Sequence, residues 1–259
     1  MKKVFTVLAI AATLMFAFVS CSKDDDNKKE NNEKTDDPKD DPKDEEKGLK
    51  ITIDGDFADW AALDTDLFVS AKNNPNSPWE GVAEIRCCAD PDFVYYYIKY
   101  NKETVEELLA LNDELPIRLN INTDGEFESG YQSYSLQGYD FILEGGLGNG
   151  EGGWGDFQAT MYQRLDGWEE LAPATSGMTK GAGKGSEYEI MVARELFNAA
   201  AAGSTVPMPM GDVFQTGVRF YETTVARPGH WEELSNMPNS SIDVVDNGWG
   251  NLLTVATVK

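Results

Sequence analysis

The chain has 259 residues and a formal net charge of −23, with 45 acidic against 22 Lys and Arg side chains. A chain this acidic lacks the clustered basic residues that displace counterions from phosphate backbones, which argues against nucleic acid as a partner. Its three cysteines, two of them adjacent, exclude a disulfide scaffold, so a hydrophobic core has to hold the fold together.

The first 21 residues have the pattern of an export signal. Two lysines precede an almost wholly apolar run over residues 4–19, which is too short to span a bilayer comfortably, and a small serine precedes Cys21. This pattern resembles a bacterial lipoprotein signal, which implies cleavage before Cys21 and lipid modification of that cysteine. The alternative is an ordinary secretory signal with a chance cysteine. We therefore expect a signal peptide over residues 1–20 and contact with the membrane through the lipid anchor only.

Residues 21–48 are predicted to form the lipidated cysteine and a disordered acidic linker. Residues 22–48 hold seven Lys against twelve Asp or Glu and no aromatic or aliphatic side chain, so the segment cannot bury enough apolar surface to fold. The acidic run directly after Cys21 resembles the surface-export signal of Bacteroidota lipoproteins. That resemblance implies an outer-membrane lipoprotein exposed at the cell surface, whereas the alternative is that the run only begins the linker.

From residue 49 onward, apolar and polar residues alternate as in β-strands with one solvated face. Such runs occupy residues 94–100, 117–122, 188–192, 214–220 and 252–258. Clusters of Gly, Asn and Asp separate the runs and are typical of turns. Helix is expected only over 102–111 and 195–202. The sequence therefore predicts one all-β domain over residues 49–259, an antiparallel, jelly-roll-like β-sandwich with one or two short helices.

Three local features have structural interpretations. Asp54 and Gly55 suit a tight turn in which glycine takes a positive φ. Trp60 is expected to fold back into the core. Cys87 and Cys88 are expected to be buried thiols at the end of a strand, because a disulfide between adjacent cysteines closes a strained ring.

Six short motifs then follow in an order typical of one family. They are Ile-Asp-Gly-x-x-x-Asp-Trp at 53–60, the strand and acidic turn at 82–96, and the motifs at 122–125, 138–141, 188–190 and 249–252. Together they resemble family 9 carbohydrate-binding modules and the related DOMON-like sandwiches. The resemblance covers nearly all of residues 51–258 and implies a β-sandwich. It implies less about function, because this architecture includes sugar-binding and haem-binding members.

Sugar binding needs a flat aromatic face together with planar polar side chains, mostly on loops held by a rigid sheet. Trp154 follows the glycine-rich stretch 145–153, and Trp231 and Trp79 also lie in predicted loops. These three tryptophans are our predicted carbohydrate-binding residues. The competing interpretation is that they plug the end of the sandwich. Trp168 is expected to cover the sheet from a hairpin.

No catalytic signature is found, since the single His230 rules out multi-histidine zinc patterns. A glycosidase pair among the many carboxylates is not singled out. The resemblance implies calcium as a possible cofactor, because the family has calcium sites, and Asp124, Glu126 and Glu128 are the candidate ligands. The residues themselves favour a plain turn at Asp124 and Gly125.

The leading hypothesis is a non-catalytic, cell-envelope lipoprotein that binds carbohydrate. A second is a structural or assembly lipoprotein that binds another envelope protein, with tyrosines at Tyr95, Tyr97 and 131–139 in the contact. A third is haem binding, in which His230 would pair with Met161, Met178 or Met191.

Overall fold

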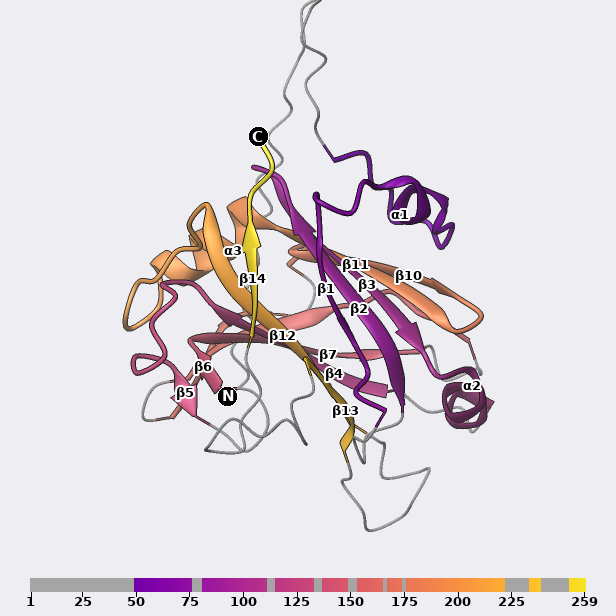
Figure 1. Ribbon diagram of the computed structural model, residues 1–259. Coiled ribbons are helices and arrows are strands. Elements are labelled where there is room, and N and C mark those ends of the chain that lie inside the picture. Colours follow the sequence, from indigo (N-terminus) through magenta and orange to yellow (C-terminus); the bar gives the residue numbers. More distant parts are fainter. Residues whose placement is uncertain are drawn as a thin grey trace, which may run out of the picture. The chain divides into compact units, whose positions relative to one another are not determined.

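The computed structural model describes residues 49–75, 81–110, 115–132, 137–148, 153–164, 167–173, 176–221, 233–238 and 252–259. Two antiparallel sheets pack face to face as a β-sandwich (Figure 1), which confirms the predicted all-β fold. The predicted signal peptide, lipidated cysteine and linker lie outside the described residues. None of the helices in the described ranges is long and apolar enough to cross a membrane.

The first sheet has five strands. Its order is β1 (Val69–Lys72), β2 (Val82–Ala89), β3 (Phe93–Tyr100), β11 (Glu187–Ala193) and β10 (Thr179–Lys184).

The second sheet has seven strands and carries the candidate site. Its order is β13 (Glu233–Met237), β12 (Val213–Tyr221), β4 (Leu115–Asn122), β7 (Phe141–Leu147), β8 (Ala159–Arg164) and β9 (Trp168–Ala172), and β14 (Leu253–Ala256) also pairs with β12. A separate two-stranded ribbon joins β5 (Tyr131–Gln132) to β6 (Gln137–Tyr139).

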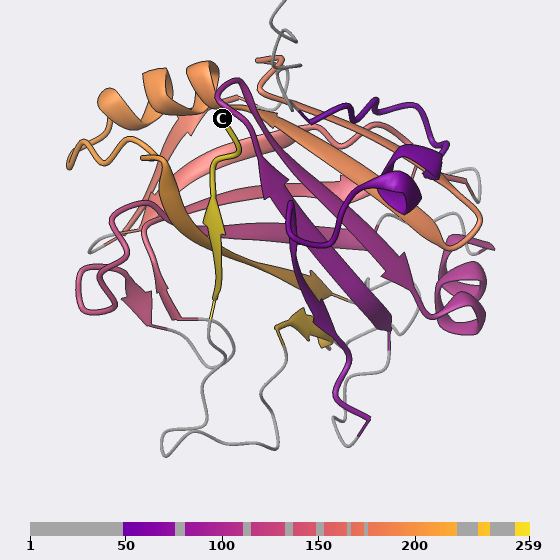
Figure 2. The same cartoon turned by 45° about the horizontal axis from the view of Figure 1, so that its top comes forward.

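Three short helices accompany the strands. They are α1 (Ala58–Ala62), α2 (Lys102–Ala110) and α3 (Arg194–Ala202), so both predicted helices form and α1 was not foreseen. Helix α3 contacts β11 of the first sheet and β9 of the second, and it closes one end of the sandwich (Figure 2). Its Phe197 packs edge-on against Phe141, with ring centroids 5.5 Å apart.

Alternating side chains build the core between the sheets. In β4 every second residue points inward and is buried, from Leu115 to Ile121, while Arg118 points to the opposite face and is partly exposed. The predicted period-two pattern over residues 117–122 is therefore confirmed. Further along the same outward face, Asn120 and Asn122 are buried, so the accessible polar group of this face is Arg118.

The outer face of the five-stranded sheet is covered by residues 49–68, which we call the N-terminal cover. Figure 2 shows this segment, with α1, on the outside of the sheet. Trp60 is 1% exposed and packs on Tyr97, with ring centroids 5.7 Å apart. The cover also buries Tyr95. It explains why β3 is aromatic on both faces, and it confirms the predicted burial of Trp60.

Cys87 and Cys88 point to opposite faces of β2. Cys87 belongs to the core between the sheets, whereas Cys88 lies under the N-terminal cover. Both are free and buried, as predicted. Burial raises the pKa of both thiols well above the ordinary value, which keeps them protonated and unreactive.

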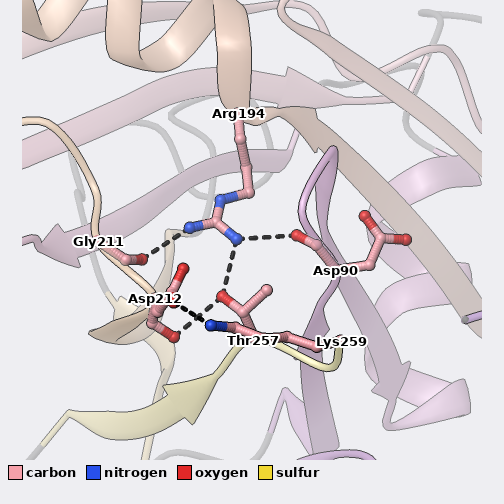
Figure 3. A network of polar contacts seen from close by, with 6 residues as sticks. All are labelled: Asp90, Arg194, Gly211, Asp212, Thr257 and Lys259. Carbon is pink, nitrogen blue, oxygen red and sulfur yellow. Dashed lines mark hydrogen bonds and ion pairs between the residues drawn. The ribbon is translucent and has the colours of Figure 1, made fainter.

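Arg194, at the start of α3, joins three separate segments of the chain (Figure 3). Its Nη1 donates to the carbonyl of Asp90 at 2.8 Å and to the hydroxyl of Thr257 at 2.7 Å, and its Nη2 donates to the carbonyl of Gly211 at 2.7 Å. The side chain is buried. These bonds fasten the residues after β14 to the β2–β3 turn, where Thr257 also forms a parallel bridge to Ala89.

Candidate functional site

The outer face of the seven-stranded sheet holds the candidate site. Strand alternation turns the side chains of Arg118 in β4, Ile142 and Glu144 in β7, and Tyr162 in β8 away from the core. With Trp168 of β9 they line a cavity of about 250 Å³, which we call the outer-face cavity. The strand pairing brings these residues together, because β4, β7, β8 and β9 are neighbours in the sheet.

Trp168 is the main apolar surface of the outer-face cavity. It is 44% exposed. Its ring lies 5.9 Å from that of Tyr131 and 6.2 Å from that of Tyr162, the latter in an edge-on arrangement of 80°. These contacts hold the indole in place while a large part of it remains open to solvent.

Arg118 and Glu144 supply the charged groups of the cavity. They face each other across β4 and β7, and Arg118 Nε donates to the Glu144 carboxylate. The guanidinium carbon also lies 5.8 Å from the centre of the Trp168 ring. With the two side chains 29% and 38% exposed, the ion pair adds only about 0–1 kcal/mol to stability.

This combination can bind a hydroxyl-rich ligand. An exposed indole offers a flat apolar face, arginine offers donors in a fixed plane, and glutamate offers acceptors. Glu144 is the one carboxylate among the described residues that line the cavity. The arrangement suits binding.

Trp154, predicted as a carbohydrate-binding residue, lies elsewhere. Its ring centroid is 5.2 Å from that of Tyr100 and 5.1 Å from that of Tyr188, and its Nε1 donates to the carbonyl of Gly185 at 3.0 Å. It packs against the core at an end of the sandwich. This placement agrees with the competing interpretation, although sugar binding by Trp154 stays a prediction.

The other two predicted tryptophans, Trp79 and Trp231, lie outside the described residues. Trp168 was placed on the sheet correctly but was not selected as a binding residue. The structure shows why Trp168 is available: Trp168 and Glu170 alternate with less exposed neighbours along β9, so both belong to the solvated face.

The candidate calcium ligands form a turn. Asp124 Oδ1 accepts the backbone N–H of Glu126 at 2.8 Å, and its Oδ2 accepts the hydroxyl of Ser129 at 3.0 Å. Gly125 has a φ of +76°. Within the described ranges, no group of three His, Cys, Asp or Glu side chains is placed to hold a metal ion, and Glu128 is exposed.

Asp140 is a buried carboxylate beside this turn. Its Oδ2 accepts the backbone N–H of Thr123 at 2.8 Å and the Thr123 hydroxyl at 3.1 Å. Burial raises the pKa of the Asp140 carboxyl to about 6, against the opposing effect of the bonds from Thr123. The carboxyl group of Asp140 is therefore part of the turn, and its pKa lies above that of an ordinary aspartate.

Some residues proposed for the other two hypotheses are buried, whereas Tyr131 and Met191 are partly exposed. Tyr95 and Tyr97 are about 95% buried under the N-terminal cover, so they do not offer a surface to a partner. Met161 and Met178 belong to the core between the sheets, and His230 lies outside the described residues.

A scan against protein-family models finds no match for this chain. A search of the curated proteins finds no relative either. The function has to be argued from the site itself.

Proposed function

We propose that this protein is a cell-envelope lipoprotein whose β-sandwich binds carbohydrate, without catalysis, in the outer-face cavity. The observation that carries the proposal is the exposed indole of Trp168 beside the Arg118–Glu144 pair. Sugars bind where a flat aromatic surface meets planar polar groups, because the ring stacks while its hydroxyls exchange hydrogen bonds. A rigid sheet fixes these groups in advance, which lowers the entropy cost of binding.

The family assignment is part of the same proposal. The six ordered motifs support a relation to family 9 carbohydrate-binding modules and DOMON-like domains, and the two-sheet fold is compatible with it. The pattern around Cys21 supports a lipid anchor, and the acidic run after it supports an outer-membrane location facing the cell exterior.

The test is a glycan array, followed by titration calorimetry on the purified full chain. We expect binding to at least one glycan and a loss of at least about tenfold in affinity for Trp168→Ala. Phe127→Ala is the matched control, because Phe127 is a comparably exposed aromatic, at 42%, that does not line the cavity. Failure of the wild-type chain to bind any glycan contradicts the proposal, and so does unchanged affinity in Trp168→Ala.

A further inference from the structure

Arg118 and Glu144 are the two charged side chains among the five that line the outer-face cavity. Arginine only donates hydrogen bonds and an ionised carboxylate only accepts them. A sugar hydroxyl does both, so one hydroxyl can accept from Arg118 and donate to Glu144. A carboxylate or sulfate on a sugar can only accept, so it gains nothing from Glu144 and is repelled by its charge.

We propose that Glu144 is a specificity-determining residue, which selects uncharged, hydroxyl-bearing sugars and rejects sugars that carry a carboxylate or a sulfate. The inference deepens the proposed function and rests on it. Glu144 has this effect because it is fixed beside Arg118, where it neutralises the positive charge that would otherwise attract an acidic sugar.

Charged residues of both signs lie just outside the cavity. Glu170 lies opposite Tyr162 across β8 and β9, is exposed, and shares the outer face with Trp168. Arg219 faces Arg118 across β12 and β4 and, like Glu170, does not line the cavity. The chain as a whole carries a net charge of −23, so its long-range field also opposes the approach of an anion.

The experiment compares two forms of one glycan. The neutral oligosaccharide that binds most tightly on the array is converted at its primary hydroxyls to the carboxylate form, which keeps the same backbone. Both forms are titrated into the purified full chain and into Glu144→Gln, which keeps the size of the side chain and removes its charge. Glu195→Gln, an exposed glutamate on α3, controls for the change in overall charge.

We expect the wild type and Glu195→Gln to bind the neutral form at least about tenfold more tightly than the carboxylate form. In Glu144→Gln the ratio should fall below about threefold, mainly because the carboxylate form binds better. Thermal unfolding shows whether each variant is folded.

The outcomes separate the two proposals. Binding of neither form, nor of any other glycan, contradicts carbohydrate binding as such. The role of Glu144 is overturned if the wild type binds the carboxylate form more tightly than the neutral form. It is also overturned if Glu144→Gln leaves the ratio of the two affinities unchanged. In both cases carbohydrate binding itself stands.

Discussion

The indole N–H of Trp60 donates to a carboxylate oxygen of Glu189 over 3.0 Å, which joins the N-terminal cover to β11 of the five-stranded sheet. The other oxygen of Glu189 accepts the backbone N–H groups of Asp54 and Gly55, each at 2.8 Å. Glu189 is buried, and burial raises the pKa of its carboxyl despite these three donors. One acidic side chain therefore anchors the opening Ile-Asp-Gly-x-x-x-Asp-Trp motif.

Glu189→Ala should release the N-terminal cover. The substitution leaves two buried N–H donors, of Gly55 and Trp60, and the partly buried N–H of Asp54 without their acceptor, and we expect it to lower the free energy of unfolding by about 3 kcal/mol. It should also speed proteolytic cleavage within residues 49–68, because the cover then opens locally. Denaturant unfolding and limited proteolysis measure the two effects. Glu195→Ala, on the exposed face of α3, should change neither; a cover equally protected in both variants would refute the anchoring role.

Trp154→Ala should affect stability and leave binding unchanged. The indole fills space between Tyr100 and Tyr188, so its removal creates a cavity, and we expect a loss of about 2–3 kcal/mol in the free energy of unfolding. Because Trp154 does not line the outer-face cavity, glycan affinity should stay within about twofold of wild type. The glycan affinity is measured by titration calorimetry at a temperature where the variant is folded. A large loss of affinity with little loss of stability would instead support the original interpretation of Trp154 as the sugar platform.

Trp154 also shows what the sequence could and could not predict. Alternation along β4 was enough to assign its inward and outward residues, because that pattern is local. The glycine-rich stretch before Trp154 indicated an exposed loop. The indole instead packs against Gly183 of β10, where an added Cβ would lie 2.5 Å from the Trp154 Cγ. A glycine on a distant strand that makes room for a ring is invisible to local patterns.

The outer-face cavity was missed for a similar reason. Arg118 lies on β4 and Trp168 on β9, and these strands are separated by β7 and β8 in the sheet. The two side chains come together only because the strands are arranged in this order. Strand order depends on long-range pairing, which a single sequence does not reveal. The sequence predicted that Arg118 points outward and that Trp168 covers the sheet. It did not predict that the two side chains lie close together.

Arg194→Lys should destabilise the fold far more than loss of the exposed ion pair between Lys259 and Asp212 nearby. Lysine cannot donate to all three acceptors that the planar guanidinium reaches, so these partly buried hydrogen bonds to Asp90, Gly211 and Thr257 are not all kept. We expect a loss of about 2–4 kcal/mol in the free energy of unfolding.

The control for Arg194→Lys is Lys259→Ala. Lys259 pairs with Asp212 at 2.7 Å in the same network (Figure 3), but both side chains are largely exposed. Exposed ion pairs contribute little, so this variant should unfold at nearly the wild-type denaturant concentration. Equal effects of the two substitutions would show that Arg194 does not fasten the chain after β14.

The stability of the protein should depend on the protonation of Asp140. Its folded-state pKa of about 6 lies above the ordinary value of 3.8, so the folded form binds a proton more readily than the unfolded form. The contribution of Asp140 to stability therefore rises as the pH falls through about 6 and is lost as the pH rises through it. Asp140→Asn removes this titration while keeping an oxygen that can accept from Thr123.

The measurement is denaturant unfolding of the wild type and Asp140→Asn at pH 7.5 and pH 5. Burial also raises the pKa of Glu189. Because Glu189 is present in both proteins, the effect of its titration cancels when the two are compared. Relative to wild type, the variant should be more stable at pH 7.5 than at pH 5, by about 1 kcal/mol after allowance for solvent screening. Asp212→Asn should show no such gain, because Lys259 lowers the pKa of Asp212 and the side chain is exposed. A stability difference between wild type and Asp140→Asn that is constant with pH would mean that the buried carboxyl does not titrate in this range.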